Sequence, residues 1–269
     1  MSHKVFLQNI SINVDLENDY YGAEFWNKIS SRTYEPDTIG FLEDNCDERT
    51  DFLDIGTANG AMSLIAAASG ATVFGYEPDP LIYKVATKNF QLNPLLHRKI
   101  NLKNIALSSG SGSTKFGSGE FSDVLSSIVI AGSVKNPVQE IAIVALFNEL
   151  DHVHTDRARK LVVKMDIEGA EWKIFQSEEC LNALKNHSAK VLLAIHPGFY
   201  RPFKHFRFSP NRIRYVYWQL KNFRESMYTF RKIQEVARVF RTNLSPVVKP
   251  RTFALLVLAG YHEFIVDFA

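Results

Sequence analysis

The segment 51–60, with the sequence DFLDIGTANG, constrains the fold of this chain more than any other part of it. It begins with a short apolar run, which is typical of a strand buried in a parallel sheet. Small residues then form a tight turn, and a helix-like stretch, 61–69, follows. Because small residues let backbone N–H groups approach a ligand closely, this arrangement predicts a site for a nucleotide-like cofactor. The candidate contacts in the turn are Gly56, Ala58, Asn59 and Gly60.

The acid that precedes this turn indicates which cofactor is bound. Asp54 would repel a pyrophosphate, which counts against NAD, and the spacing also lacks the last glycine of the Gly-x-Gly-x-x-Gly fingerprint. Its carboxylate suits a cation such as the ammonium of a methionine moiety. Glu77 ends the next apolar run, where a carboxylate can accept both hydroxyls of a ribose. Together the two acids predict S-adenosylmethionine (SAM); the alternative is a helix-capping aspartate and a solvated loop glutamate.

Composition places the chain in a broad class. Its 269 residues, 46% of them hydrophobic, suit one α/β domain with an added element and a sizeable core. The two cysteines, Cys46 and Cys180, provide neither a disulfide framework nor a metal cluster, so we expect a reducing, cytoplasmic setting. No stretch has the length and hydropathy of a membrane span, and the first residues lack the apolar core of a signal peptide.

Strand-like apolar runs alternate with helical patterns along the chain, which predicts a mostly parallel, doubly wound sheet. We expect 1–50 to form a helical or irregular cover and 51–269 to form the main domain. The apolar run at 141–147 fits both a strand and a helix, and 253–258 should pair with 263–268 as closing antiparallel strands. The expected parallel strands are 51–56, 71–77, 100–107, 160–166 and 190–196, with a helix from Pro80 to about Asn93.

Ligands of such sheets lie at the carboxyl ends of the strands. Besides Asp54 and Glu77, this rule selects Asp166 and His196, each of which ends an expected strand. The third strand places Asn104 and Ala106 near the same edge, where an adenine could be held.

The segment 164–171, KMDIEGAE, is the second informative motif. Asp166 and Glu168 are close enough to disfavour joint ionisation unless a cation or a proton lies between them. They could share a divalent metal with His196, bind a substrate hydroxyl or take its proton. The alternative is structural: Asp166 caps the following helix, and Glu168 and Glu171 favour its positive N-terminus.

Four motifs in this order resemble the FkbM family of SAM-dependent methyltransferases. They are DIGTANG at 54–60, EPDP at 77–80 followed by Asn89 and Asn93, NIALS at 104–108, and KMDIEGAE at 164–171. The resemblance covers roughly 50–198 and implies a class I methyltransferase (Rossmann-like) fold with a seven-stranded sheet and a C-terminal antiparallel strand pair. It also implies methyl transfer, usually to a hydroxyl oxygen of a sugar or secondary metabolite.

The resemblance assigns roles to particular residues. It places SAM against Asp54, Gly56, Asn59, Gly60, Glu77 and Ala106, and it turns Asp166 toward the reaction site. Two positions depart from the family pattern. Thr57 is an insertion in the turn, and Ala194 stands where an acid is more usual, so we predict no metal site although a divalent metal remains compatible with the motif.

The segment 199–250 matches nothing in the family pattern and is strongly basic. Residues 197–251 contain thirteen lysines and arginines against two acidic residues. Apolar residues recur at three- and four-residue steps from Ile213 to Phe240, which predicts a long amphipathic helix inserted in the domain. Its basic face suits an anionic glycan, a lipid head group at a membrane surface, or nucleic acid; the alternative is a merely solvated face.

Our main hypothesis is O-methylation of a hydroxyl of a sugar, polysaccharide or secondary metabolite. Its catalytic candidates are His196 as general base, Asp166 to orient the hydroxyl or assist the base, and Glu168 beside it. An RNA methyltransferase that uses the basic helix is the alternative, but the Asn/Asp-Pro-Pro-Tyr/Phe motif of amino-group methylation is missing after the fourth strand. A non-catalytic binding module is disfavoured because the acids of three strand ends are intact.

Overall fold

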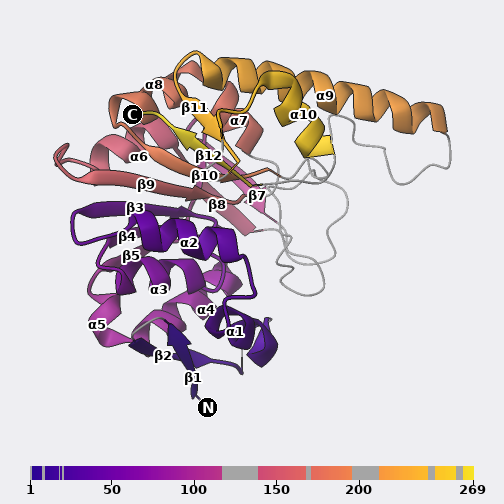
Figure 1. The fold of residues 1–269 in the computed structure, drawn as a ribbon. Helices are drawn as coiled ribbons and strands as arrows, with labels where there is room; N and C mark the ends of the chain where they lie inside the picture. Colours follow the sequence, from indigo (N-terminus) through magenta and orange to yellow (C-terminus); the bar gives the residue numbers. More distant parts are fainter. Residues whose placement is uncertain are drawn as a thin grey trace.

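The computed structural model describes residues 2–7, 10–17, 19, 21–116, 139–167, 171–195, 212–241, 246–258 and 263–269. At its centre is a seven-stranded sheet with the strand order β11-β12-β10-β9-β3-β4-β5 (Figure 1). From β10 to β5 the neighbouring strands are parallel, and β12 runs antiparallel to both β10 and β11. The strands are β3 (Thr50–Ile55), β4 (Thr72–Tyr76), β5 (Ile100–Lys103), β9 (Lys160–Met165), β10 (Lys190–Ala194), β11 (Arg238–Phe240) and β12 (Glu263–Asp267). This topology confirms the predicted doubly wound α/β fold.

Helices cover both faces of the sheet and bury a separate apolar core on each (Figure 1). Five helices and a hairpin lie on the first face: α1 (Gly22–Ser30), α2 (Pro36–Asn45), α3 (Ala61–Ala68), α4 (Pro80–Gln91) and α5 (Pro94–His97), with β1 (Ser2–Leu7) and β2 (Ile10–Asp15). The second face carries α6 (Leu146–Val153), α7 (Glu171–Gln176), α8 (Glu178–Asn186), α9 (Arg212–Gln234) and α10 (Pro250–Leu258).

Local sequence signals explain the elements that lead to the strand ends. All six residues of β3 are buried, as its apolar pattern requires for a central strand. Asp79 caps α4, because its side chain accepts hydrogen bonds from the backbone N–H groups of Leu81 and Ile82 at 2.8 and 3.4 Å. Pro80 occupies the first turn, where its missing N–H costs no hydrogen bond. The helix therefore starts where the sequence predicts.

The first half of the chain departs from the expectation in two places. The cover formed by 1–50 is not only helical or irregular, because β1 and β2 pair as an antiparallel hairpin ahead of α1 and α2. The expected third strand, 100–107, is divided into β5 and β6 (Ala106–Ser108). β6 leaves the main sheet and joins a second one with β7 (Gly112–Phe116) and β8 (Gln139–Ala145). The ambiguous run at 141–147 thus ends β8 and begins α6.

The C-terminal part contains the main error. Residues 253–258 form part of α10 rather than a strand, since a short continuous apolar run fits a helix as well as a strand and Pro250 is accepted in a first turn. The antiparallel partners of β12 are β10 on one side and β11, which contributes 238–240, on the other. The long helix predicted up to Phe240 therefore ends at Gln234, and Figure 1 shows this helix, α9, running past the end of the sheet.

Candidate active site

The turn after β3 brings two strand ends close together. Gly56 has a φ of +85°, and a Cβ added there would lie 2.0 Å from the backbone carbonyl oxygen of Asp166. Gly60 has a φ of +90°, and a Cβ there would meet the Phe90 ring at 2.5 Å. Both positions therefore need glycine for backbone conformation and for space. The loop consequently passes directly against the end of β9.

Thr57, which looked like an insertion, holds this loop in place. Its hydroxyl donates to the carbonyl oxygen of Asp54 at 2.9 Å and accepts from the backbone N–H of Tyr76 at 2.9 Å. The side chain is buried, so these bonds are shielded from water. Thr57 thus joins the end of β3 to the end of β4, the two strands that carry the predicted cofactor acids.

Asp54 is fully buried at the end of β3. Its Oδ2 accepts a 2.6 Å hydrogen bond from the Ser63 hydroxyl at the start of α3. Its Oδ1 has no hydrogen-bond partner among the described residues. Burial raises the pKa of Asp54, while Lys164 and Ser63 oppose that rise. A buried carboxylate oxygen without a donor is costly in a finished structure and suits a ligand that brings one.

Glu77 lies just after β4 with only 7% of its surface exposed. Its Oε2 accepts from the backbone N–H of Ala58 at 2.9 Å, and its Oε1 accepts from that of Asp79 at 2.8 Å. Burial raises the pKa of Glu77 to about 8, against the effect of these two hydrogen bonds. The carboxylate is thus fixed beside the turn, although it lies 23 residues from Asp54 in the sequence.

Asp166 follows β9, and 29% of its side chain is exposed. Its Oδ2 lies 3.3 Å from the Nζ of Lys164, and the same Nζ lies 3.9 Å from Oδ1 of Asp54. Asp54 and Asp166 therefore lie on either side of one lysine. The predicted cofactor acid and the predicted acceptor acid belong to one cluster.

Three other residues predicted to contact the cofactor have contacts within the protein. Asn59 donates to the carboxylate of Asp19 at 3.2 Å, so it connects the turn to the N-terminal cover. Asn104 donates to the carbonyl oxygens of Glu77 and Pro78 at 2.7 and 3.1 Å, which fixes the chain after β4. Ala106 is buried in β6 and pairs with Ile143 of β8.

Glu168 and His196 lie outside the described residues, so their proposed catalytic roles stay predictions. Within the described parts of the chain, no group of three or more histidines, cysteines and acids could hold a metal ion. None of the helices described there is long and apolar enough to cross a membrane.

Sequence reasoning missed an aromatic and acidic cluster in the N-terminal cover, formed by Tyr21, Phe25, Tyr34 and Glu35. Tyr21 and Tyr34 both pack on Phe25, and the centroids of their rings lie 4.6 and 4.7 Å from the centroid of the Phe25 ring. Burial raises the pKa of both tyrosines, and the charge of Asp166 adds to the effect, so the rings lie within electrostatic range of it. Glu35 accepts a hydrogen bond from Tyr34 and adopts a left-handed conformation with a φ of +41°. Arg32, Ala58 and Ser188 also have a positive φ, and a local sequence pattern does not predict this conformation for such residues.

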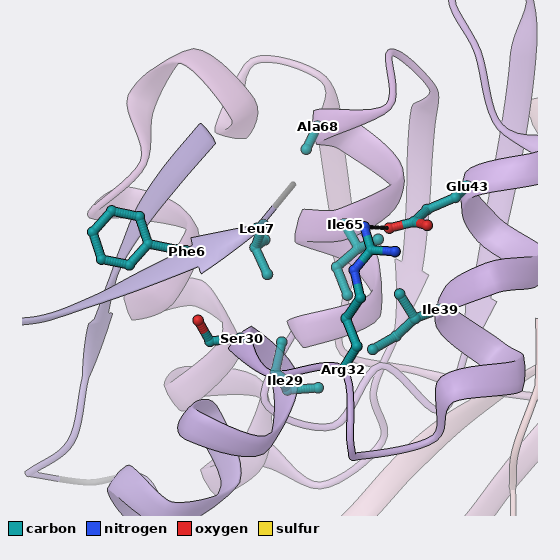
Figure 2. Close-up of a pocket in the computed structure, with 9 residues that line it drawn as sticks. All are labelled: Phe6, Leu7, Ile29, Ser30, Arg32, Ile39, Glu43, Ile65 and Ala68. Carbon is teal, nitrogen blue, oxygen red and sulfur yellow. Dashed lines mark hydrogen bonds and ion pairs between the residues drawn. The ribbon is translucent and has the colours of Figure 1, made fainter. Parts of the chain in front are cut away.

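A further pocket lies between the hairpin, α1, α2 and α3 (Figure 2). Arg32 and Glu43, two of its lining residues, form an ion pair of 2.6 Å. Its volume of about 20 Å³ has room for roughly one water molecule. None of the predicted site residues lines it, so we assign the chemistry to the strand ends.

A family profile described as the methyltransferase FkbM domain matches residues 54–225, more than half of the chain. The chain belongs to the FkbM methyltransferase family. Membership confirms the prediction that this protein is a methyltransferase, and it supports SAM as the cofactor. The match begins at Asp54 and includes Glu77 and Asp166, the acids that the fold brings to one edge of the sheet.

Solved structures resemble this FkbM methyltransferase only distantly. A SAM-dependent methyltransferase from Agrobacterium tumefaciens is 13% identical, with 72% of this chain and 53% of that chain covered and a TM-score of 0.34. A TehB-like SAM-dependent methyltransferase from Corynebacterium glutamicum is 12% identical, with 93% and 95% covered and a TM-score of 0.37. The chain spans about half the length of the Agrobacterium protein. No curated protein matches the sequence significantly.

Proposed function

We propose that this FkbM methyltransferase binds SAM at the carboxyl ends of β3 and β4. The observation that carries the proposal is the buried Oδ1 of Asp54, an acceptor without a donor among the described residues. It would take the amino group of SAM, and the Glu77 carboxylate would take the ribose hydroxyls. The glycines of the turn, Gly56 and Gly60, allow the backbone to lie this close to the site.

The acceptor, on this proposal, is a hydroxyl of a sugar, polysaccharide or secondary metabolite. SAM would supply an electrophilic methyl group, so the protein has to align the acceptor oxygen and remove its proton. On this proposal Asp166 orients that hydroxyl, and His196 is the predicted general base. Two features of the cluster formed by Tyr21, Phe25, Tyr34 and Glu35 support a neutral polyhydroxyl acceptor. Tyr21 and Tyr34 offer aromatic rings that can stack on a sugar, and the nearby carboxylates would repel an anion.

The experiment supplies labelled SAM to the protein together with separate panels of glycans, lipids and RNAs. We expect label transfer to a glycan or a hydroxylated small molecule, and base-stable label in the product would exclude a methyl ester. Asp166→Asn should keep SAM affinity and lose most of the transfer, whereas Asp44→Asn, an exposed acid on α2, should behave as the parent. Transfer to RNA alone would refute the sugar proposal and support the alternative. A failure of the parent to bind SAM in calorimetry would refute the cofactor site itself.

A further inference from the structure

Lys164 is a buried lysine in the middle of the sheet. It lies in β9 between Val163 and Met165, both fully buried, and only 8% of its side chain is exposed. In the register of the parallel pair β3–β9 it stands opposite Asp54. A lysine in a central strand is costly unless its charge is paired, because the ammonium loses its water. Its position therefore calls for a role that an apolar residue could not fill.

One ammonium serves two carboxylates in this place. The Nζ of Lys164 lies 3.3 Å from Oδ2 of Asp166 and 3.9 Å from Oδ1 of Asp54. The shorter distance is a hydrogen bond, and the longer one is an ion pair without one. The Ser63 hydroxyl already holds the other oxygen of Asp54. Lys164 thus connects the acid on the cofactor side with the acid on the acceptor side.

The charges that face Lys164 come from several elements. Asp54 belongs to β3, and Asp166 follows β9. Tyr34 and Glu35 precede α2. Glu263 of β12 adds a further carboxylate within electrostatic range of Asp166 and Glu35. Burial lowers the pKa of Lys164, but the carboxylates of Asp166, Asp54 and Glu35 outweigh it and raise the pKa overall. The side chain therefore stays protonated and cannot act as a base at neutral pH.

We propose that Lys164 is a positioning residue whose ammonium keeps Asp54 and Asp166 ionised at the same time. The inference rests on the proposed function, in which Asp54 receives the amino group of SAM and Asp166 faces the acceptor. Asp54 is fully buried and Asp166 is partly buried, so these two neighbouring carboxylates cannot both stay charged once the shared cation is removed, and one would take up a proton. A protonated Asp54 would bind the amino group poorly, and a protonated Asp166 would no longer orient the acceptor as an anion.

The test compares Lys164→Met, Lys164→Arg and the parent, with Lys160→Met as the matched control. Lys160 begins the same strand, but 56% of its side chain is exposed. SAM affinity is measured by calorimetry from pH 6 to pH 9. At pH 7 we expect the Kd of Lys164→Met to be at least about tenfold weaker, the equivalent of one pKa unit, and to improve as the pH rises. Lys164→Arg and Lys160→Met should follow the parent. The same Kd and the same pH dependence in Lys164→Met would overturn the inference.

Unfolding of the free protein supplies a second readout that needs no cofactor. In Lys164→Met the folded-state pKa of a buried carboxylate should lie above its unfolded value of about 4. Its contribution to stability is then present at low pH and is lost as the pH rises through the folded pKa. The stability gap to the parent should therefore widen from pH 5 to pH 8. A gap that is constant with pH would indicate lost packing and overturn the inference.

The double variant Lys164→Met with Asp166→Asn keeps the test decisive if the single variant does not fold. In this double variant Asp54 keeps its carboxylate but no longer has a second carboxylate beside it. It should therefore fold better than Lys164→Met and recover part of the SAM affinity at pH 7. No recovery in either property would overturn the inference. A parent that does not bind SAM would instead refute the proposed function. A parent that binds SAM beside an unaffected Lys164→Met would refute the role of Lys164 alone.

Discussion

Gly56→Ala tests how closely the turn 56–60 after β3, the cofactor turn, approaches the end of β9. The structure offers a matched control in Gly22→Ala, at the start of α1. Both glycines have a positive φ, +85° at Gly56 and +63° at Gly22. Around Gly22 an added Cβ meets nothing within 4 Å, whereas at Gly56 it would lie 2.0 Å from the carbonyl oxygen of Asp166. The two variants share the backbone strain and differ in the clash.

The magnitudes follow from these two terms. A left-handed conformation costs an L-residue about 1–2 kcal/mol, so we expect Gly22→Ala to lose about that much stability. At Gly56 the neighbour is backbone, and the N–H of Asp166 is itself held by a 3.0 Å hydrogen bond to the carbonyl of Ile55. Relief of the clash has to move a strand end, at a further cost of about 1–3 kcal/mol. Gly56→Ala should therefore lose about 2–5 kcal/mol, a large share of the roughly 5–15 kcal/mol of a typical domain.

Urea unfolding of both variants measures the difference, since the midpoint shifts with stability while the slope stays constant. Calorimetry with SAM adds a functional readout: the shift should move Asp54 relative to Asp166, so Gly56→Ala should also weaken SAM binding, and Gly22→Ala should not. Equal losses of stability in the two variants would show that the turn does not press on β9. Unchanged SAM affinity in a destabilised Gly56→Ala would separate the clash from the site.

Three further predictions concern charge. Because the folded pKa of Glu77 is raised to about 8, its ionisation should cost the folded protein stability as the pH rises from about 4.5 to 8. The stability of Glu77→Gln relative to the parent should therefore rise by on the order of 3 kcal/mol between pH 6 and pH 9, measured by urea unfolding, while its SAM affinity falls. A stability difference between the two proteins that does not change with pH would contradict the buried charge. Asp54→Asn should weaken SAM binding by about 1–3 kcal/mol in calorimetry, the scale of one charged hydrogen bond, and an unchanged Kd or tight NAD binding by the parent would refute the assignment. Arg224, Arg231 and Arg238 are exposed on α9 and β11, and their reversal to Glu should leave both SAM binding and the acceptor KM at low salt unchanged if the acceptor is neutral as proposed. A KM that rises at low salt in this triple variant would instead indicate that the basic face recruits an anionic acceptor.

The sequence by itself determined the elements around the cofactor turn. The apolar run before Asp54 is long enough only for a short buried strand, and small residues at Gly56 and Gly60 permit only a tight turn after it. The cap at Asp79 and the proline after it fixed the start of α4 in the same local way. Such signals act over a few residues, so they can be interpreted without knowledge of the fold. The rule that parallel strands expose their carboxyl ends at one edge then brought Asp54, Glu77 and Asp166 together.

Tertiary structure decided what those local signals leave open. The apolar run at 253–258 became a helix because β11, 238–240, already pairs with β12, and periodicity cannot reveal a competing partner. Asn59 hydrogen-bonds Asp19, and Asn104 hydrogen-bonds the chain just after β4. These partners lie far away in the sequence, so only the packed fold brings them together. The sequence KLVVKM shows Lys164 inside an apolar strand, but it does not show that Asp54 and Asp166 both lie beside the ammonium of this lysine. Their meeting depends on the register of β3 against β9, which exists only once the sheet is assembled.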